Sequence, residues 1–208
     1  MNFLLALASL AGIWFLVVII PGPNFVVVSQ SAISNSRNFG LRIALGVSTG
    51  ASIWATASLF GLNLVFEHAA WLYDTIRIIG GMYLLYMGVK TIWMVFSSSS
   101  VPLKVKKYSG TGISAFQRGL FTSFSNPKTA AFFGSLFVAA FPAHAPVWVY
   151  VGTIGMVFGV SFLWYSVVAC FFSLATVRGV YHRLKRGFDI ITGSLLSLLG
   201  IRLAFSKS

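Results

Sequence analysis

The sequence predicts an all-α integral membrane protein with six transmembrane helices, arranged as two inverted three-helix repeats in which helices 1 and 4 are broken. Three observations favour this class. Hydrophobic residues make up 57% of the 208 residues and charged residues only 9%, whereas about a quarter of the residues in a soluble domain are charged. The apolar residues form runs long enough to cross a bilayer. Proline-containing stretches interrupt two of these runs, one in each half of the chain.

Six apolar segments each provide the ~20 helical residues that a membrane span needs. They cover residues 3–31 (interrupted at 21–24), 41–66, 70–96, 114–141 (interrupted at 125–128), 145–175 and 187–206. A polar linker at 97–113 separates the first three segments from the last three. We therefore expect one transmembrane domain over 1–208, with repeat one at about 1–96 and repeat two at about 114–208. No positive residue precedes the first run, so we expect it to remain as a span rather than act as a cleaved signal peptide.

The positive residues predict an orientation in the membrane. Three fall on one side of a six-span model, at Arg77, Arg202 and Lys207. Eleven fall on the other side, at Arg37, Arg42, Lys90, Lys104, Lys106, Lys107, Arg118, Arg178, Arg183, Lys185 and Arg186. Lys and Arg gather in cytoplasmic loops, so both termini are predicted to be periplasmic. The net charge of +12 is spread over short loops and forms no basic domain, which excludes nucleic acid as a partner.

The residue types present exclude most enzymatic chemistry. Cys170 is the single cysteine, so the chain has no intramolecular disulfide and no CxxC pair. Three acidic residues, Glu67, Asp74 and Asp189, and three scattered histidines disfavour a metal site or a pair of catalytic carboxylates. We expect no cofactor, no metal and no enzymatic activity. A transporter is the leading hypothesis, and a channel or a metal-ion or other small-solute exporter is the alternative.

The two halves match each other in three segments. The offset between matching residues rises along the chain in the way that insertions would produce, although each match alone is weak. The matches place Pro23 on Pro127, Gly46 and Gly50 on Gly155 and Gly159, and Gly81 and Gly88 on Gly193 and Gly200. Three spans per half is an odd number, so the second copy must be inverted. Inverted repeats with broken helices at corresponding positions indicate a secondary transporter.

The prolines at the two breaks determine which backbone groups lose their helical partners. Pro21 and Pro23 free the carbonyls of Val17 and Ile19, because proline has no N–H to donate. Downstream, Pro23 and Pro127 suit the first position of a new helix, with Gly22 and Asn126 as its caps. Each break therefore offers a helix N-terminus, which carries a partial positive charge and favours a carboxylate.

A polar residue follows each of these prolines. Lys128 lies ten residues after Arg118, or ~15 Å of helix rise, which places it near the middle of a ~30 Å hydrocarbon core. Lysine at this depth indicates a binding or gating role, and the alternatives are snorkelling or a structural clamp on freed carbonyls. The predicted substrate-binding residues are Gly22, Pro23, Asn24, Asn126, Pro127 and Lys128.

Asp189 is the only acidic residue near a span on the basic side. Two interpretations remain open for it, namely an interfacial ion pair with the preceding basic residues and a carboxylate for proton coupling or ammonium binding. The two G-x-x-x-G pairs predict close helix packing, at Gly46 and Gly50 and at Gly155 and Gly159.

Four motifs together resemble the LysE/RhtB family of amino-acid exporters, and the resemblance covers essentially the whole chain. They stand here as "PGPNFVVVSQ", "ALGVSTG", "GGMYLLYMGVK" and "FQRGLFTSFSNPKTAAFFGSLF". The stretches "FVVVSQSAISNSR" and "WYSVVACFF" resemble the threonine efflux branch of that family. Asn24 stands where other members carry Asp, and its amide cannot ionise.

The resemblance implies a function. It implies secondary active export of small neutral amino acids, of the threonine, homoserine or homoserine lactone type, across the bacterial inner membrane. It also implies that the proton motive force drives export, with protons and the lipid bilayer as partners, and it is compatible with a homo-oligomer. A zwitterion needs donors for its carboxylate and acceptors for its ammonium, and the two breaks supply both. The scarcity of acidic residues disfavours cationic substrates such as lysine.

Overall fold

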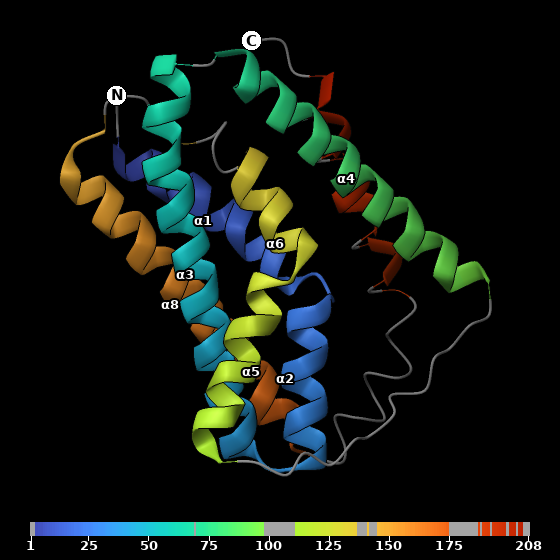
Figure 1. Ribbon diagram of the computed structural model, residues 1–208. Coiled ribbons are helices and arrows are strands. Elements are labelled where there is room, and N and C mark those ends of the chain that lie inside the picture. Colours follow the sequence, from blue (N-terminus) through green and yellow to red (C-terminus); the bar gives the residue numbers. More distant parts are fainter. Residues whose placement is uncertain are drawn as a thin grey trace.

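A computed structural model describes residues 3–68, 70–97, 111–136, 141, 145–174, 187, 189–191, 193–198, 200–202 and 204–205. Most of the central linker and the basic loop before the last segment lie outside these ranges, so the expectations for those residues stay expectations. Within the described part every regular element is helical, as predicted for an all-α protein (Figure 1).

The helices follow the predicted apolar segments closely. In chain order they are α1 (Phe3–Ile19), α2 (Pro23–Ser34), α3 (Arg37–His68), α4 (Ala70–Phe96), α5 (Gly112–Phe124), α6 (Pro127–Ala131), the π-helix η1 (Phe132–Leu136) and α8 (Val147–Phe172). The described residues between 187 and 205 are also helical. The π-helix, which the sequence did not predict, continues directly from α6.

Membrane-spanning length is clear for part of this set. The stretch Arg37–Gly61 of α3 and the whole of α8 are each long and apolar enough to cross a bilayer. The pair α1 and α2 meets the same test as one span bent by 58°. The part of the chain that the structure describes therefore contains two helices of spanning length, or three spans if the bent pair is one span, and the predicted count of six is not reached within it.

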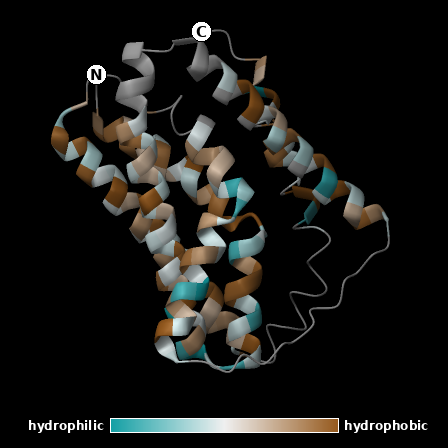
Figure 2. Ribbon diagram, in the orientation of Figure 1, coloured by the Kyte–Doolittle hydropathy of each residue, from teal (hydrophilic) through white to brown (hydrophobic). Residues whose placement is uncertain are grey.

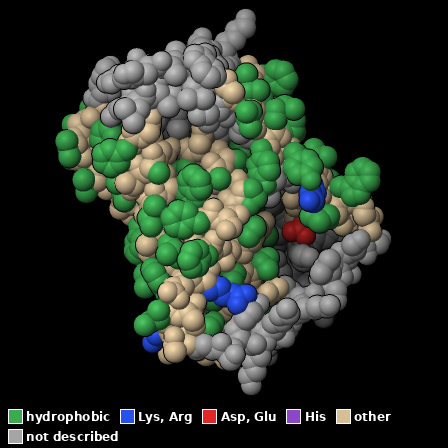
Figure 3. Space-filling model, viewed as in Figure 1, with side chains coloured by type: hydrophobic (Ala, Val, Ile, Leu, Met, Phe, Trp, Pro, Cys, Tyr) green, Lys and Arg blue, Asp and Glu red, His purple; other side chains and the backbone are tan. Residues whose placement is uncertain are grey.

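The surface of these helices suits lipid rather than water. Large apolar side chains such as Leu4, Phe60 and Leu163 are more than 60% exposed, whereas a soluble monomer limits such exposure to small patches. Hydrophobic side chains cover much of the visible face in Figure 3, and Figure 2 shows hydrophilic residues at the end where α2 meets α3 and α5 begins. The protein is a multi-pass membrane protein.

α3 is the central helix, and it packs mainly on α5 and α8. A methyl group added to Gly46 would overlap the Phe116 carbonyl of α5, and one added to Gly50 would lie 2.7 Å from the Ser123 Cβ. Both distances are too short for a side chain, so α3 and α5 approach closely only because these residues are glycines. Gly119 of α5 contributes a third close approach, against the Ile43 carbonyl.

The second glycine pair behaves differently from the prediction. Gly155 and Gly159 lie on an exposed face of α8, and a methyl group on either one would meet no described atom within 4 Å. α8 instead turns Val149, Thr153, Val157 and Ser161 toward the core. The packing role expected for Gly155 and Gly159 is therefore absent within the described part of the monomer, because helix orientation buries another face.

α4 and the C-terminal helical segment, which the sequence aligns with each other, are in direct contact. A methyl group on Gly81 would lie 2.9 Å from the Gly200 carbonyl oxygen, and one on Gly88 would lie 2.5 Å from the Gly193 carbonyl oxygen. The reverse contacts are equally close, at 2.6 Å for Gly200 against Gly81 and 2.7 Å for Gly193 against Gly88. In the sequence alignment, Gly81 corresponds to Gly193 and Gly88 to Gly200. Gly81 therefore contacts the counterpart of Gly88, and Gly88 contacts the counterpart of Gly81. Reciprocal contacts of this kind are typical of a two-fold interface between antiparallel copies.

Candidate functional site at the two helix breaks

The first break separates α1 from α2 and lies where the sequence predicts it. α1 ends at Ile19, and α2 begins at Pro23 with Gly22 as its N-cap. Gly22 has an extended backbone (φ −160°, ψ −171°) and provides no side-chain cap. The carbonyls at the end of α1 therefore point into the break without helical donors, because Pro21 and Pro23 have no N–H to offer.

The second break is shorter and is closed by a side-chain cap. α5 ends at Phe124, α6 begins at Pro127, and Asn126 Oδ1 accepts a hydrogen bond from the backbone N–H of Lys128 at 3.0 Å. This confirms the prediction that asparagine caps the second half-helix and that Pro127 begins it. Asn126 is fully buried, so the cap is formed inside the protein.

Lys128 joins the two breaks. Its Nζ donates to the Ile20 carbonyl at 2.7 Å and to the Val17 carbonyl at 3.0 Å, although the side chain is only 2% exposed. The ammonium thus reaches from α6 across to the end of α1. Val17 was predicted as a freed carbonyl, and Ile20 takes the place predicted for Ile19. Snorkelling to the membrane surface does not occur, because the ammonium is enclosed between the two breaks.

The space around Lys128 is narrow on the side of Gly22. A methyl group on Gly22 would lie 3.2 Å from Lys128 Nζ and 3.4 Å from its Cε. The backbone of the first break therefore packs directly on the lysine of the second break. Any side chain at position 22 would press on the ammonium.

Buried polar atoms without partners lie close to the breaks. Asn24 Oδ1, Asn126 Nδ2 and Ser123 Oγ are all buried and form no hydrogen bond with the described residues. Orphaned polar groups are costly in an apolar interior, and a native protein that retains them usually does so for a function. These atoms add an acceptor at the first break and a donor at the second.

Tyr165 of α8 is a site residue that the sequence analysis missed. The Tyr165 hydroxyl lies close to the Asn24 side chain, and Tyr165 is 1% exposed. The only signal in the sequence was a tyrosine in the middle of an apolar span. α8 therefore contributes to the first break together with α1 and α2.

Aromatic packing holds the breaks in place on one side. The Trp14 ring of α1 lies 4.8 Å from the Phe132 ring and 4.9 Å from the Phe133 ring of the π-helix, measured between centroids. Its indole N–H donates to Ser161 Oγ of α8 at 2.9 Å. The Ser58 hydroxyl of α3 donates to the Phe133 carbonyl, one of the carbonyls at which the α-helical ladder is interrupted.

A separate apolar cluster packs on the first break. In it Ile20 packs with Leu84 of α4 and Leu196 of the C-terminal segment.

The predicted residues divide into two groups. Gly22, Pro23, Asn24, Asn126, Pro127 and Lys128 all lie at the two breaks, which contact each other through Lys128. Asp189 lies on the C-terminal segment, half-buried and with an interaction of its own. It precedes Leu196, the residue of that segment that packs on Ile20, by seven residues or ~10 Å of helix rise.

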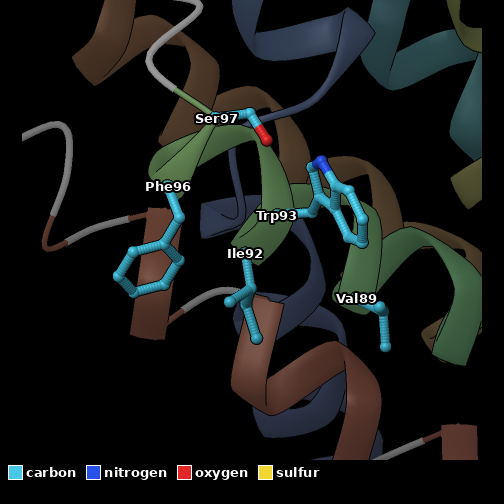
Figure 4. A pocket seen from close by; sticks show the side chains of 5 residues that line it. All are labelled: Val89, Ile92, Trp93, Phe96 and Ser97. Atoms are coloured by element: carbon cyan, nitrogen blue, oxygen red, sulfur yellow. The ribbon is translucent and has the colours of Figure 1, made fainter.

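A hollow of about 460 Å³ lies elsewhere, at the end of α4 (Figure 4). Val89, Ile92, Trp93, Phe96 and Ser97 line it, and it is open to the outside. Its lining is almost wholly apolar, with no charged group to hold an amino acid. The break region therefore remains the candidate site.

Comparisons with known proteins identify the family of this chain. The model of the LysE type translocator family matches residues 15–207. The chain is 34% identical to the threonine efflux protein of Escherichia coli K12 and 36% identical to that of Salmonella typhi, in each case over 90% of this chain and 91% of the relative. It is 30% identical to the uncharacterised membrane protein YahN of Escherichia coli, over 89% of this chain and 82% of the relative. No solved structure matches the chain significantly.

Members of this family move solutes and are not enzymes, which agrees with a site made of amides, carbonyls and one ammonium. The family match covers both breaks, and the relatives align along nearly their whole length. With its two proline breaks joined through Lys128, this chain belongs to the LysE family of translocators.

Proposed function

We propose that this chain is a secondary active exporter of small neutral amino acids of the threonine or homoserine type, located in the bacterial inner membrane. The observation that carries the proposal is the contact of Lys128 with both breaks, in a chain that is similar to threonine efflux proteins. A buried lysine at the meeting point of two broken helices is rare, because burial of a charged group costs free energy, and it indicates a solute pathway.

The site has the groups that a zwitterion requires. The N-terminal ends of α2 and α6, Lys128 and the Asn126 amide N–H groups supply donors for a carboxylate. The carbonyls of Val17 and Ile20 and the Asn24 amide oxygen supply acceptors for an ammonium. We propose a role for Asp189 in proton coupling, at a distance from the substrate.

The transport architecture is part of the same proposal. We propose six spans in two inverted repeats, with both termini periplasmic and the proton motive force as the energy source. The reciprocal contacts of Gly81 with Gly200 and of Gly88 with Gly193 support the inverted repeat, because they relate α4 to its predicted counterpart. Each repeat then contributes one break to a shared site near the middle of the membrane.

Counterflow in proteoliposomes tests this function. Purified protein is reconstituted and loaded with one unlabelled amino acid, and uptake of a labelled panel is followed with and without an imposed pH gradient. We expect counterflow for threonine or homoserine and stimulation by the gradient. Conductance without counterflow would instead indicate a channel, and absence of both would refute the proposal.

A further inference from the structure

We infer that the site selects a zwitterion by exchange with Lys128, an inference that rests on the proposed function. The ammonium of the substrate takes the Val17 and Ile20 carbonyls, and the displaced Lys128 ammonium pairs with the carboxylate of the substrate. In this scheme Lys128 is a tethered cation that occupies the ammonium position when no substrate is bound. The site would then accept free amino acids and reject their esters and lactones, so the homoserine lactone that the resemblance implies is not expected as a substrate of this chain.

The first argument is the chemistry of the two carbonyls. They accept hydrogen bonds of 3.0 and 2.7 Å from a primary ammonium that is nearly excluded from solvent. The α-ammonium of an amino acid presents the same three N–H donors as the lysine ammonium. A carbonyl pair that satisfies one ammonium is therefore suited to the other, and the two compete for it.

The second argument is the charge of the site. Lys128 brings one positive charge, and carbonyl dipoles hold it in the described structure. A second cation would place two like charges in a buried space, which is strongly unfavourable. A zwitterion adds no net charge to the site. Its carboxylate pairs with the displaced Lys128 ammonium, while its own ammonium moves from solvent to the two carbonyls. Lys128 consequently excludes cations and admits zwitterions.

The third argument is the pair of orphaned amide atoms. Asn126 Nδ2 lies on the same cap that binds the Lys128 backbone, so it adds a donor on the carboxylate side. Asn24 lies in the first turn of α2, next to the break whose carbonyls hold Lys128 Nζ, so its Oδ1 adds an acceptor at the first break. Exchange gives both atoms a partner, whereas a permanent Lys128 clamp leaves both unsatisfied.

The alternative is that Lys128 never leaves the carbonyls. It would then stabilise the fold without selecting among ligands. Removal of its charge would lower the stability of the protein, or lower the affinity for every ligand by the same factor. It would not change which ligand binds more tightly. The two models therefore differ in the order of affinities and not only in their size.

The experiment compares L-threonine with its methyl ester in binding to purified protein at about pH 6, below the α-amino range, where the ester is a cation and threonine is a zwitterion. Binding is measured by calorimetry on the wild type, Lys128→Met, Lys128→Gln and the control Lys90→Met. Lys90 is an exposed lysine of α4 that lies over the Tyr86 ring, so the control removes a lysine outside the site. Glutamine keeps an N–H donor on a side chain that is one bond shorter, so Lys128→Gln serves as the second uncharged variant if Lys128→Met fails to fold.

We expect the wild type and Lys90→Met to prefer threonine over the ester by about tenfold or more, as the loss of one charge-assisted contact would give. The Lys128 variants should reverse this order and bind the ester more tightly. An unchanged preference for threonine in a folded Lys128 variant would overturn the inference, as would equal binding of both ligands to the wild type.

The test separates failure of the inference from failure of the proposed function. If counterflow identifies another amino acid, that compound and its own methyl ester form the ligand pair, and the same reversal is expected. If no amino acid is exported, the function fails on the transport assay alone. If threonine is exported but the order of affinities does not reverse, only the exchange by Lys128 is refuted.

Discussion

The Lys128 ammonium donates a hydrogen bond of 2.7 Å to the Ile20 carbonyl, and so the second helix break holds the first across 108 residues of sequence. The same ammonium reaches Val17, one turn earlier in α1. Removal of the side chain would leave two buried carbonyls without a donor, at a cost of about 1–3 kcal/mol each.

We therefore expect Lys128→Ala to abolish export and to lower the thermal stability of the purified protein, while folded protein is still recovered. Export is measured by counterflow and folding by size-exclusion chromatography in detergent. Lys90→Ala is the control, because it removes an exposed lysine of α4. Normal export by Lys128→Ala would rule out the break region as the substrate site.

Gly22→Ala tests the close approach of the first break to Lys128. The new methyl would lie 3.2 Å from Nζ, so the ammonium must shift by a few tenths of an ångström. The extended backbone at Gly22 accepts alanine without strain, so the fold should remain intact. We expect export to fall about tenfold, since small misplacements of a positioned group are costly.

The matched control for that variant is Gly12→Ala. Gly12 lies on an exposed face of α1, and its methyl would meet no described atom within 4 Å. Its export should equal that of the wild type. Equal rates for Gly22→Ala and Gly12→Ala would show that the ammonium position is unimportant for transport.

Asn126 has two separable roles, and substitution can divide them. Serine caps a helix about as well as asparagine, so Asn126→Ser should keep the bond to the Lys128 backbone while it removes the orphaned Nδ2 donor. We expect unchanged stability and a KM for export raised about tenfold. Asn126→Ala should in addition lose about 1 kcal/mol of stability with the cap. A KM for Asn126→Ser equal to that of the wild type would leave Asn126 as a cap only.

The two G-x-x-x-G pairs should respond in opposite ways. Gly46→Ala places a methyl on the Phe116 carbonyl and must separate α3 from α5, which costs about 1–3 kcal/mol. Gly155→Ala enters open space on α8 and replaces a poor helix former, so it should be neutral or stabilising by up to ~1 kcal/mol. Denaturation in detergent compares the two, and equal losses of stability would contradict the arrangement of α8.

The positions of the breaks were predictable because proline acts locally. Pro21, Pro23 and Pro127 remove backbone donors whatever surrounds them, and the chain provides Gly22 and Asn126 as caps. The bounds of α4 agree with the predicted segment 70–96, and the cause is again local. A long apolar run must form a helix to cross the membrane, so the length of the run sets the length of the helix. The π-helix after α6 was not predictable, because tertiary contacts of Phe132, Phe133 and Ser58 hold it.

The sequence by itself determined the membrane class, the two proline breaks and the presence of one lysine at the second break. Only the tertiary structure decided which carbonyls this lysine binds, because Val17 and Ile20 come within reach of Lys128 only when the chain folds. It also decided that Gly46 and Gly50 meet another helix and that Gly155 and Gly159 do not. A motif determines which contacts a helix can make, whereas the rotation of the helix in the bundle determines which of them are formed.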